Sequence, residues 1–240
     1  LLKEIYKKGL IYKGYTVQPY SPKAGTGLSS HELNQPGTYK DVSDVSITAM
    51  FKILNSSLPE ELETDSDLFF LAWTTTPWTL PSNTALTISK KINYVVIDTF
   101  NLYTEKPIRV LLAKDLINKV FDNKFVEINS SKDLLFKSTK KKIPFLIINQ
   151  VKGDRLIDVR YEKIWEDAPL PNDNHENAYR VISGDFVTTD EGTGIVHTAP
   201  TFGSDDALAA SQASPPVPPL LTKDKNGELV PLVDLQGKFI

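Results

Sequence analysis

The sequence contains no cysteine and only three histidines in 240 residues. Without cysteine, the chain can form no disulfide, no thiolate-bound zinc site and no cysteine nucleophile. The histidines, His31, His175 and His197, are too few to favour a histidine-based metal site. We therefore expect neither a metal nor a cofactor.

Long apolar runs and a strong excess of charge are also missing. No apolar segment approaches the ~20 residues that cross a membrane. Residues 1–15, LLKEIYKKGLIYKGY, lack both a signal-peptide core and an initiator methionine. A net charge of −3 disfavours a broad nucleic-acid surface but permits contact with a short nucleic-acid segment. These features predict a soluble cytoplasmic protein excised from a longer chain, with no membrane partner.

Alternating and β-branched segments predict a mainly β domain of the α+β class. The expected strands cover residues 45–53, 67–76, 93–100, 107–113, 143–151 and 155–164. A short helix is expected over residues 114–122. Helical spacing also covers residues 1–12 and stops at Gly14, and the Gly/Pro-rich residues 15–40 predict irregular structure.

The C-terminal part combines strand, helix and turn signals. Residues 178–200 predict two strands joined at Asp190-Glu191-Gly192. Residues 204–213 predict a helix with Ser204 as its N-cap. Four prolines between residues 215 and 219 end that helix, and Asn226-Gly227 predicts a hairpin turn.

The first candidate site motif is LAWTTTPWTLPSN, residues 71–83. In a strand, the side chains of Thr74 and Thr76 share one face and Thr75 points to the other. Pro77 removes a backbone donor and keeps the residue before it extended, so the strand should end there. Hydroxyls would then gather at one edge of the sheet.

A second turn is expected at Pro81-Ser82-Asn83. This turn would bring the amide of Asn83 back toward Thr76. Such a cluster can hold a water molecule or a ribose hydroxyl, although it contains no strong base. Taken alone, the motif is more typical of a threonine-rich strand that ends in a proline turn.

The second candidate motif is GTGIVHTAPTFGSDD, residues 192–206. Gly192 and Gly194 allow tight backbone geometry beside a ligand. His197 lies on the expected strand, and Asp205 and Asp206 open the helix that follows. A carboxylate and an imidazole at one pocket mouth could bind an ammonium group. The simpler alternatives are a core histidine and two carboxylates that stabilise the first helical turn by ~0.3–1 kcal/mol each.

Several other readings find no support in the sequence. Neither G-x-S-x-G nor the glycine-rich phosphate-binding motifs occur. His31 and His175 lie in polar or Gly/Pro-rich segments and should be on the surface. The basic run Lys140-Lys141-Lys142 is typical of a solvated face rather than of a nucleic-acid contact.

Together, the two motifs resemble the editing domain of the isoleucyl-tRNA synthetases, which are class I aminoacyl-tRNA synthetases. Residues 14–42 also resemble the segment that leads into this domain in bacterial members. The resemblance implies a β-barrel-like editing domain with short peripheral helices. Residues 1–43 would be a connector, residues 44–214 the editing core and residues 215–240 a linker and hairpin.

The resemblance implies an aminoacyl-ester deacylase within an isoleucine–tRNA ligase. One extra methylene adds only ~1–3 kcal/mol to binding in an apolar pocket, a magnitude already established for this family itself. Valine is therefore accepted in error, and a second, smaller pocket removes it from the tRNA. The implied partners are the aminoacylated 3′ end of the isoleucine tRNA, its valine moiety and the rest of the synthetase.

The resemblance also implies roles for individual residues. Asp206 would bind the substrate α-ammonium group, with Asp205 beside it, and His197 would shape the side-chain pocket. Thr76 and Asn83 would position the attacking water or the ribose hydroxyls. The implied substrate-binding residues are Thr74, Thr75, Trp78, Gly192, Gly194 and Asp205. No general base is evident, so water positioning is the expected mechanism.

Two alternatives to an enzyme remain open at this point. The domain could bind the tRNA acceptor end or a free amino acid without hydrolysing an ester, which the missing base would suit. It could also be a structural insertion, although the joint presence of Thr76, Asn83, His197 and Asp206 argues against that. Convergence of these four side chains on one cleft is the decisive geometric criterion.

Overall fold

The computed structural model describes residues 1–12, 17–43, 45–134, 142–234 and 236–240. The chain divides into two compact units, Leu1–Lys40 and Asp41–Ile240. Three expectations fall on positions outside the described residues: the helix stop at Gly14, the domain boundary at residue 44 and the basic residues 140 and 141. No helix in the described part of the chain is long and apolar enough to cross a membrane.

The first unit is more regular than its composition predicts. Helix α1 (Leu2–Lys7) is shorter than the expected 1–12, because the chain turns at Gly9 with φ of +68°. Strands β1 (Tyr20–Ser21) and β2 (Thr26–Gly27) form an antiparallel pair. Helix α2 (Ser30–Leu33) begins at a capping box between Ser29 and Glu32. The expectation of irregular structure over residues 15–40 is therefore wrong for these three short elements and holds for the other described residues of the segment.

A mixed sheet of nine strands dominates the second unit, counting only described residues. Its strands are β3 (Ile47–Lys52), β4 (Leu68–Thr74), β5 (Ala85–Ile88), β6 (Asn93–Phe100), β7 (Pro107–Ala113), β8 (Phe125–Glu127), β9 (Ile143–Lys152), β10 (Arg180–Ser183) and β11 (Ile195–Thr198). They run in the order β10-β5-β11-β4-β7-β6-β9-β8, and β3 pairs with β4 beside this path. The predicted mainly β fold class is confirmed.

Short helices connect the strands of this sheet. The 3₁₀-helices are η1 (Asn55–Ser57), η2 (Glu60–Leu62), η3 (Pro77–Ser82), η4 (Lys114–Leu116), η5 (Ser131–Asp133), η6 (Gly153–Leu156) and η7 (His175–Asn177). The α-helices of this unit are α3 (Ile117–Val120) and α4 (Ser204–Gln212). The helix predicted over residues 114–122 is thus confirmed as η4 followed by α3.

The sheet forks at β4. One edge of β4 pairs with β3 along residues 69–74. The other edge is shared, because β7 pairs with Leu68–Phe70 and β11 pairs with Trp73. Two half-sheets therefore diverge from β4, one through β7 and one through β11. Strand β4 ends at Thr74, on the side of the fork that faces β11.

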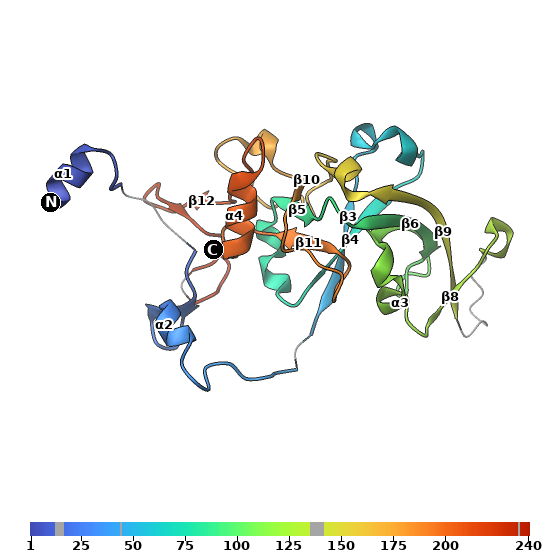
Figure 1. Cartoon of the computed structure of the whole chain (residues 1–240), viewed down its shortest axis with the longest axis horizontal. Helices are drawn as coiled ribbons and strands as arrows, with labels where there is room; N and C mark the ends of the chain where they lie inside the picture. Colours follow the sequence, from blue (N-terminus) through green and yellow to red (C-terminus); the bar gives the residue numbers. More distant parts are fainter. Residues whose placement is uncertain (13–16, 44, 135–141, 235) are drawn as a thin grey trace. The chain divides into compact units, whose positions relative to one another are not determined.

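The half-sheet through β7 is apolar on both faces. Along β6, Tyr94 and Val96 enter the main core, whereas Val95 and Ile97 face α3. Helix α3 lies beside this half-sheet (Figure 1). A cluster of large apolar residues fills the space between them. The ring of Phe121 stacks on Phe145 with centroids 4.9 Å apart. Continuous apolar strands of this kind were predictable because alternate residues meet two different cores.

The half-sheet through β11 lies beside α4 (Figure 1). The two pack together through smaller residues than those of the other half. Its core cluster contains Ala85, Ile182, Ala209, Ala210 and Val217. Close packing of α4 on β5 and β10 follows from the alanines, because they let the helix backbone approach the sheet. Val217 belongs to the proline segment after α4, so that segment packs onto the core.

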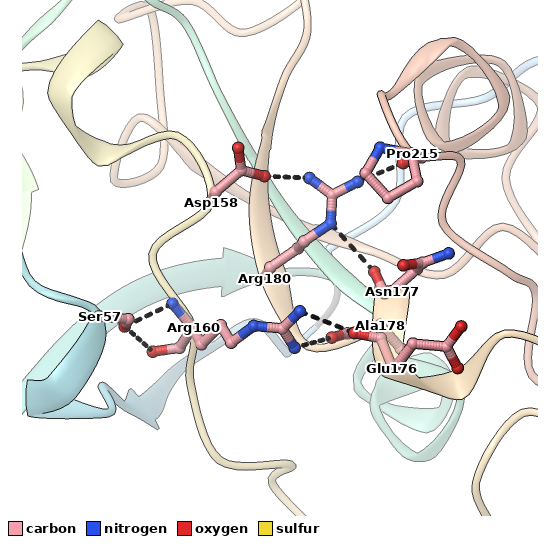
Figure 2. Close-up of polar contacts among 8 residues, drawn as sticks. All are labelled: Ser57, Asp158, Arg160, Glu176, Asn177, Ala178, Arg180 and Pro215. Carbon is pink, nitrogen blue, oxygen red and sulfur yellow. Dashed lines mark hydrogen bonds and ion pairs between the residues drawn. The ribbon is translucent and has the colours of Figure 1, made fainter.

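A buried arginine ties this half together. The guanidinium of Arg180 donates to Asp158, to the carbonyl of Pro215 and, at 3.1 Å, to the carbonyl of Asn177 (Figure 2). Its side chain is 4% exposed, whereas that of Asp158 is 61% exposed. Arg160 supports the neighbouring loop by donating to the carbonyls of Glu176 and Ala178 (Figure 2). These contacts join β10 to the chain segments before and after it.

Most predicted strands are confirmed, but residues 155–164 do not form one. Residues Gly153–Leu156 form η6 instead, and isolated bridges at Arg160 and Tyr161 follow. Val159 and Tyr161 are buried in alternation, which produced the strand-like pattern. The backbone turns at Asp158, where φ is +66°, so a continuous strand is impossible.

Two further expectations about the C-terminal part are corrected. β10 and β11 are not joined directly at residues 190–192, because both pair with β5 and residues 184–194 connect them. Helix α4 has Gly203 rather than Ser204 at its N-cap and no side-chain cap. The hairpin at Asn226-Gly227 is confirmed, since β12 (Thr222–Lys223) pairs with β13 (Leu229–Val230).

Candidate functional site

A cavity lies where β4 and β11 end. Its volume of about 720 Å³ is in the range of small-molecule binding sites. Predicted site residues that line it are Thr74, Thr75, Thr76, Trp78, Gly192, His197 and Asp206. Three other predicted residues, Asn83, Gly194 and Asp205, are not among its lining residues. The two motifs, over a hundred residues apart in sequence, therefore meet at one cavity.

The threonines form a hydroxyl cluster at the end of β4. The Thr74 Oγ1 accepts the backbone N–H of Thr76 at 3.0 Å and lies 3.2 Å from the Thr76 Oγ1. Thr74 is buried and Thr76 is exposed, so the hydroxyl of Thr76 is the more accessible of the two from the cavity. The strand ends because Pro77 begins η3, as the proline signal predicted. The second turn expected at residues 81–83 is instead the end of this same 3₁₀-helix.

His197 forms the buried wall of the cavity. Its Nε2 lies 3.0 Å from the Oγ1 of Thr79, and its Nδ1 lies 2.8 Å from the Nδ2 of Asn83. The side chain is 6% exposed. Burial lowers the pKa of His197 to about 4, because the charged imidazolium would lose its hydration. The ring is therefore neutral near pH 7.

Asn83 lies behind His197 rather than in the cavity. Its Nδ2 donates to the carbonyl of Ala85 at 2.8 Å, and its Oδ1 accepts from the hydroxyl of Tyr161 at 2.7 Å. Asn83 is 3% exposed. The expected return of this amide toward Thr76 is wrong, because the amide bonds instead to His197 on β11, to Ala85 and to Tyr161.

Asp206 and its neighbour Asp205 point in different directions. The Asp206 Oδ2 accepts the backbone N–H of Ala199 at 2.8 Å, which turns the carboxylate back over the start of α4. Burial raises the pKa of Asp206, and the hydrogen bond from Ala199 opposes that shift. Asp205 is exposed and lines a separate surface hollow with Asp185.

A glycine makes room for the folded-back carboxylate. A Cβ on Gly203 would lie 2.7 Å from the Cγ of Asp206, closer than real Cβ contacts. The residue before α4 must therefore be glycine if Asp206 is to face the cavity. This close approach, and not a helix cap by Ser204, explains the local sequence Gly-Ser-Asp-Asp.

The two glycines of the second motif have different surroundings. Gly192 has φ of +75° and lies in the cavity wall beside Trp73. Gly194 has φ of +72°, but a Cβ there would lie 2.4 Å from the Cβ of Ala113. Gly194 thus allows the contact with β7 and does not approach a ligand. Only Gly192 keeps the position that the sequence predicted.

Sequence reasoning missed other residues around the cavity. Thr79 contacts His197 and donates to the carbonyl of Thr76 at 2.8 Å. Phe186 and Phe202 add aromatic surface to the lining. Thr79 lies one helical turn after Thr76, so the 3₁₀ spacing of η3 would have indicated it. Phe186 comes from the connection between β10 and β11, which no local pattern places.

The chain is similar to known proteins over its whole length. No family model matches the sequence. The chain is 54% identical to an isoleucine–tRNA ligase of Bacteroides fragilis over 239 residues and 52% identical to that of Porphyromonas gingivalis over 241 residues. Both alignments include 100% of this chain and 20% of the relative. The chain thus spans about a fifth of the length of these relatives.

A solved structure of the P. knowlesi cytosolic leucyl-tRNA synthetase editing domain is also similar, with 15% identity and a TM-score of 0.45. That match covers 68% of this chain and 61% of the other. The sequence identities place the chain among the aminoacyl-tRNA ligases. Within that class, the whole length of the chain corresponds to one region of bacterial isoleucine–tRNA ligases.

Proposed function

We propose that this chain is the editing domain of an isoleucine–tRNA ligase and hydrolyses valyl-tRNA formed in error on the isoleucine tRNA. The supporting observation is the convergence of Thr76, His197 and Asp206 on one cavity. Its partners would be the aminoacylated 3′ end of that tRNA, the valine moiety and the rest of the ligase. Similarity to isoleucine–tRNA ligases supports the tRNA, and the site chemistry supports an aminoacyl ester.

In this proposal, Asp206 binds the α-ammonium group of the amino acid. Its Oδ2 is held by the backbone N–H of Ala199, which leaves Oδ1 available to a ligand. A bound ammonium group would lower the pKa of Asp206 again, because the opposite charge favours the carboxylate. The neutral ring of His197 adds no competing positive charge to this pocket.

The hydroxyls of Thr74 and Thr76 would orient the attacking water and the ribose. Water adds to the ester carbonyl, the bond from that carbon to the ribose oxygen breaks, and the ribose oxygen takes up a proton. A neighbouring ribose hydroxyl can pass this proton, so the protein need not supply a base. The contribution of the chain is then orientation of the reacting groups.

The test compares Asp206→Asn with the matched control Asp205→Asn, using valyl-tRNA and valyl-adenosine ester as substrates. Loss of a charge-assisted contact of ~1.5–3 kcal/mol should lower kcat/KM about 10- to 100-fold for Asp206→Asn. Asp205→Asn should retain the parent rate, because Asp205 lies outside the cavity. Equal rates for the two variants would reject the Asp206 assignment.

A second candidate is capture of the acceptor end or of an amino acid without hydrolysis. The observation that favours it is His197, whose two ring nitrogens already have protein partners and whose pKa lies well below neutrality. Binding of a non-hydrolysable valyl-adenosine analogue with no turnover of the ester would support this function. Turnover that depends on Asp206 would reject it.

A further inference from the structure

The wall of the cavity is a chain of hydrogen bonds whose direction is fixed at both ends. The chain runs from Asn83 through His197 to Thr79. Each end also contacts a backbone carbonyl, and a carbonyl oxygen can only accept. These two carbonyls decide where every proton between them lies.

The first carbonyl is that of Ala85. It lies 2.8 Å from the Nδ2 of Asn83, so the amide must present its NH₂ group on this side. The other contacts of that group are the Nδ1 of His197 at 2.8 Å and the carbonyl of Thr198 at a longer 3.4 Å, and an amide NH₂ group can only donate. The Nδ1 must therefore accept, which means that it carries no proton.

The second carbonyl is that of Thr76. It accepts the only hydroxyl proton of Thr79 at 2.8 Å. Toward the Nε2 of His197, 3.0 Å away, Thr79 must then act as the acceptor. The Nε2 must carry the proton. Both ends of the chain thus independently require the same ring tautomer.

Tyr161 completes this arrangement from the core. Its hydroxyl donates to the Oδ1 of Asn83 at 2.7 Å, and burial raises its pKa so that it stays protonated. The amide of Asn83 is consequently held on both sides. Neither Tyr161 nor Asn83 is among the residues that line the cavity.

We propose that Asn83 and Tyr161 are positioning residues, which hold His197 as the neutral Nε2–H tautomer and thereby fix the cavity wall. As a consequence, neither nitrogen of His197 can take a proton from water, and the Thr79 proton is also committed. His197 acts as a wall of fixed shape and polarity. The effect of this wall on substrate choice, unlike the tautomer itself, rests on the proposed editing function.

The tautomer is tested directly in the unsubstituted protein by ¹⁵N NMR of labelled histidine side chains. The chain has three histidines, and substitution of the two exposed ones, His31→Gln and His175→Gln, identifies the remaining signal as that of His197. We expect an unprotonated Nδ1 and a protonated Nε2 near neutral pH. A protonated Nδ1 would overturn the inference, whatever the hydrolytic activity. Because this spectrum requires no substitution within the hydrogen-bond chain, it remains informative if a variant fails to fold.

Positioning is tested by Tyr161→Phe, with Tyr179→Phe as the matched control. Tyr179 packs edge-on against Tyr161 with centroids 6.3 Å apart, and its buried hydroxyl has no hydrogen-bond partner in the described chain. Tyr161→Phe should accelerate exchange of the His197 Nε2 proton with water severalfold, whereas Tyr179→Phe should leave it unchanged. Equal exchange rates in the two variants would overturn the role of Tyr161.

The same pair of variants connects the wall to substrate choice. Tyr161→Phe should reduce the ratio of valyl to isoleucyl ester hydrolysis severalfold, and Tyr179→Phe should preserve that ratio. An unchanged ratio in Tyr161→Phe would overturn the link to discrimination. Absence of hydrolysis in the parent protein, together with the expected spectrum, would reject the proposed function and leave the tautomer assignment supported.

Discussion

The two half-sheets that diverge from β4 are each covered by a helix, but they are packed with different kinds of side chain. The half against α3 buries large aliphatic and aromatic side chains such as Ile97, Phe121 and Phe145. The half against α4 buries alanines together with polar groups. Among the buried polar side chains of the described residues, Thr99 is the one that lies in the α3 half. Non-directional packing stabilises one half, and directed hydrogen bonds shape the other.

The difference matters for the site because a cavity needs fixed polar groups. A buried polar group is retained only if it has partners, and the partners then fix its orientation. In the α4 half, Thr87 and Thr198 lie 2.6 Å apart, and His197 lies between Asn83 and Thr79. The candidate site is therefore at the end of the half-sheet that contains most of the buried polar side chains of the described residues.

The largest effect should come from breaking the α3 half. Phe121→Ala should reduce the free energy of unfolding by ~3–5 kcal/mol, because the ring packs between Phe125 and Phe145. Urea unfolding measures the loss, and Val126→Ala on the exposed side of β8 is the control. Hydrolysis per folded molecule should stay constant. A loss of activity larger than the loss of folded protein would show that the two halves are coupled.

The next effect concerns pH and the α4 half. The pKa of His197 is about 4 in the folded chain and ordinarily 6.5, so the unfolded chain binds more protons between these values. Stability should therefore fall as pH decreases from 6.5 through 4, by about 3 kcal/mol in total from this group. The raised pKa of Asp206 has the opposite effect, because the stability that it contributes at low pH is lost as pH rises.

Comparison of the parent with His197→Gln isolates this contribution, because Asp206 is present in both. The difference between their unfolding free energies should change across this pH interval. A difference that stays constant from pH 7 to below 4 would mean that His197 keeps its ordinary pKa in the folded state. The wall would then be hydrated, contrary to its burial in the structure.

The side chains that make up each half-sheet explain how much of it could be predicted from the sequence. Strands β6 and β7 were predictable because long runs of Val, Ile and Leu need no partner to be recognised. β5 was missed, since Ala85–Ile88 has only four residues and includes a buried threonine. The proximity of Asn83 to His197 depends on the pairing of β5 with β11, which local sequence does not contain. Asp206 and Asp205 were distinguished by family resemblance, not by any pattern.

A moderate effect is expected where Arg180 joins β10 to its neighbours. Arg180→Met should destabilise the fold by ~1–3 kcal/mol, because the carbonyls of Asn177 and Pro215 lose a buried donor (Figure 2). Asp158→Asn should cost less than about 1 kcal/mol, since that carboxylate is largely exposed. Thermal or urea unfolding measures both. Equal losses would indicate that the ion pair, rather than the carbonyl contacts, anchors the arginine.

The smallest effect should come from the exceptional polar group of the α3 half. The hydroxyl of Thr99 donates to the carbonyl of Pro144 at 2.9 Å. Thr99→Val keeps the side-chain shape and removes one hydrogen bond, so we expect a loss of roughly 1 kcal/mol in urea unfolding. Valyl-ester hydrolysis should be unchanged, because this bond only connects β6 with β9. A change in activity would mean that a hydrogen bond in the apolar half also influences the cavity. The contrast between one half stabilised by apolar packing and another shaped by hydrogen bonds would then be wrong.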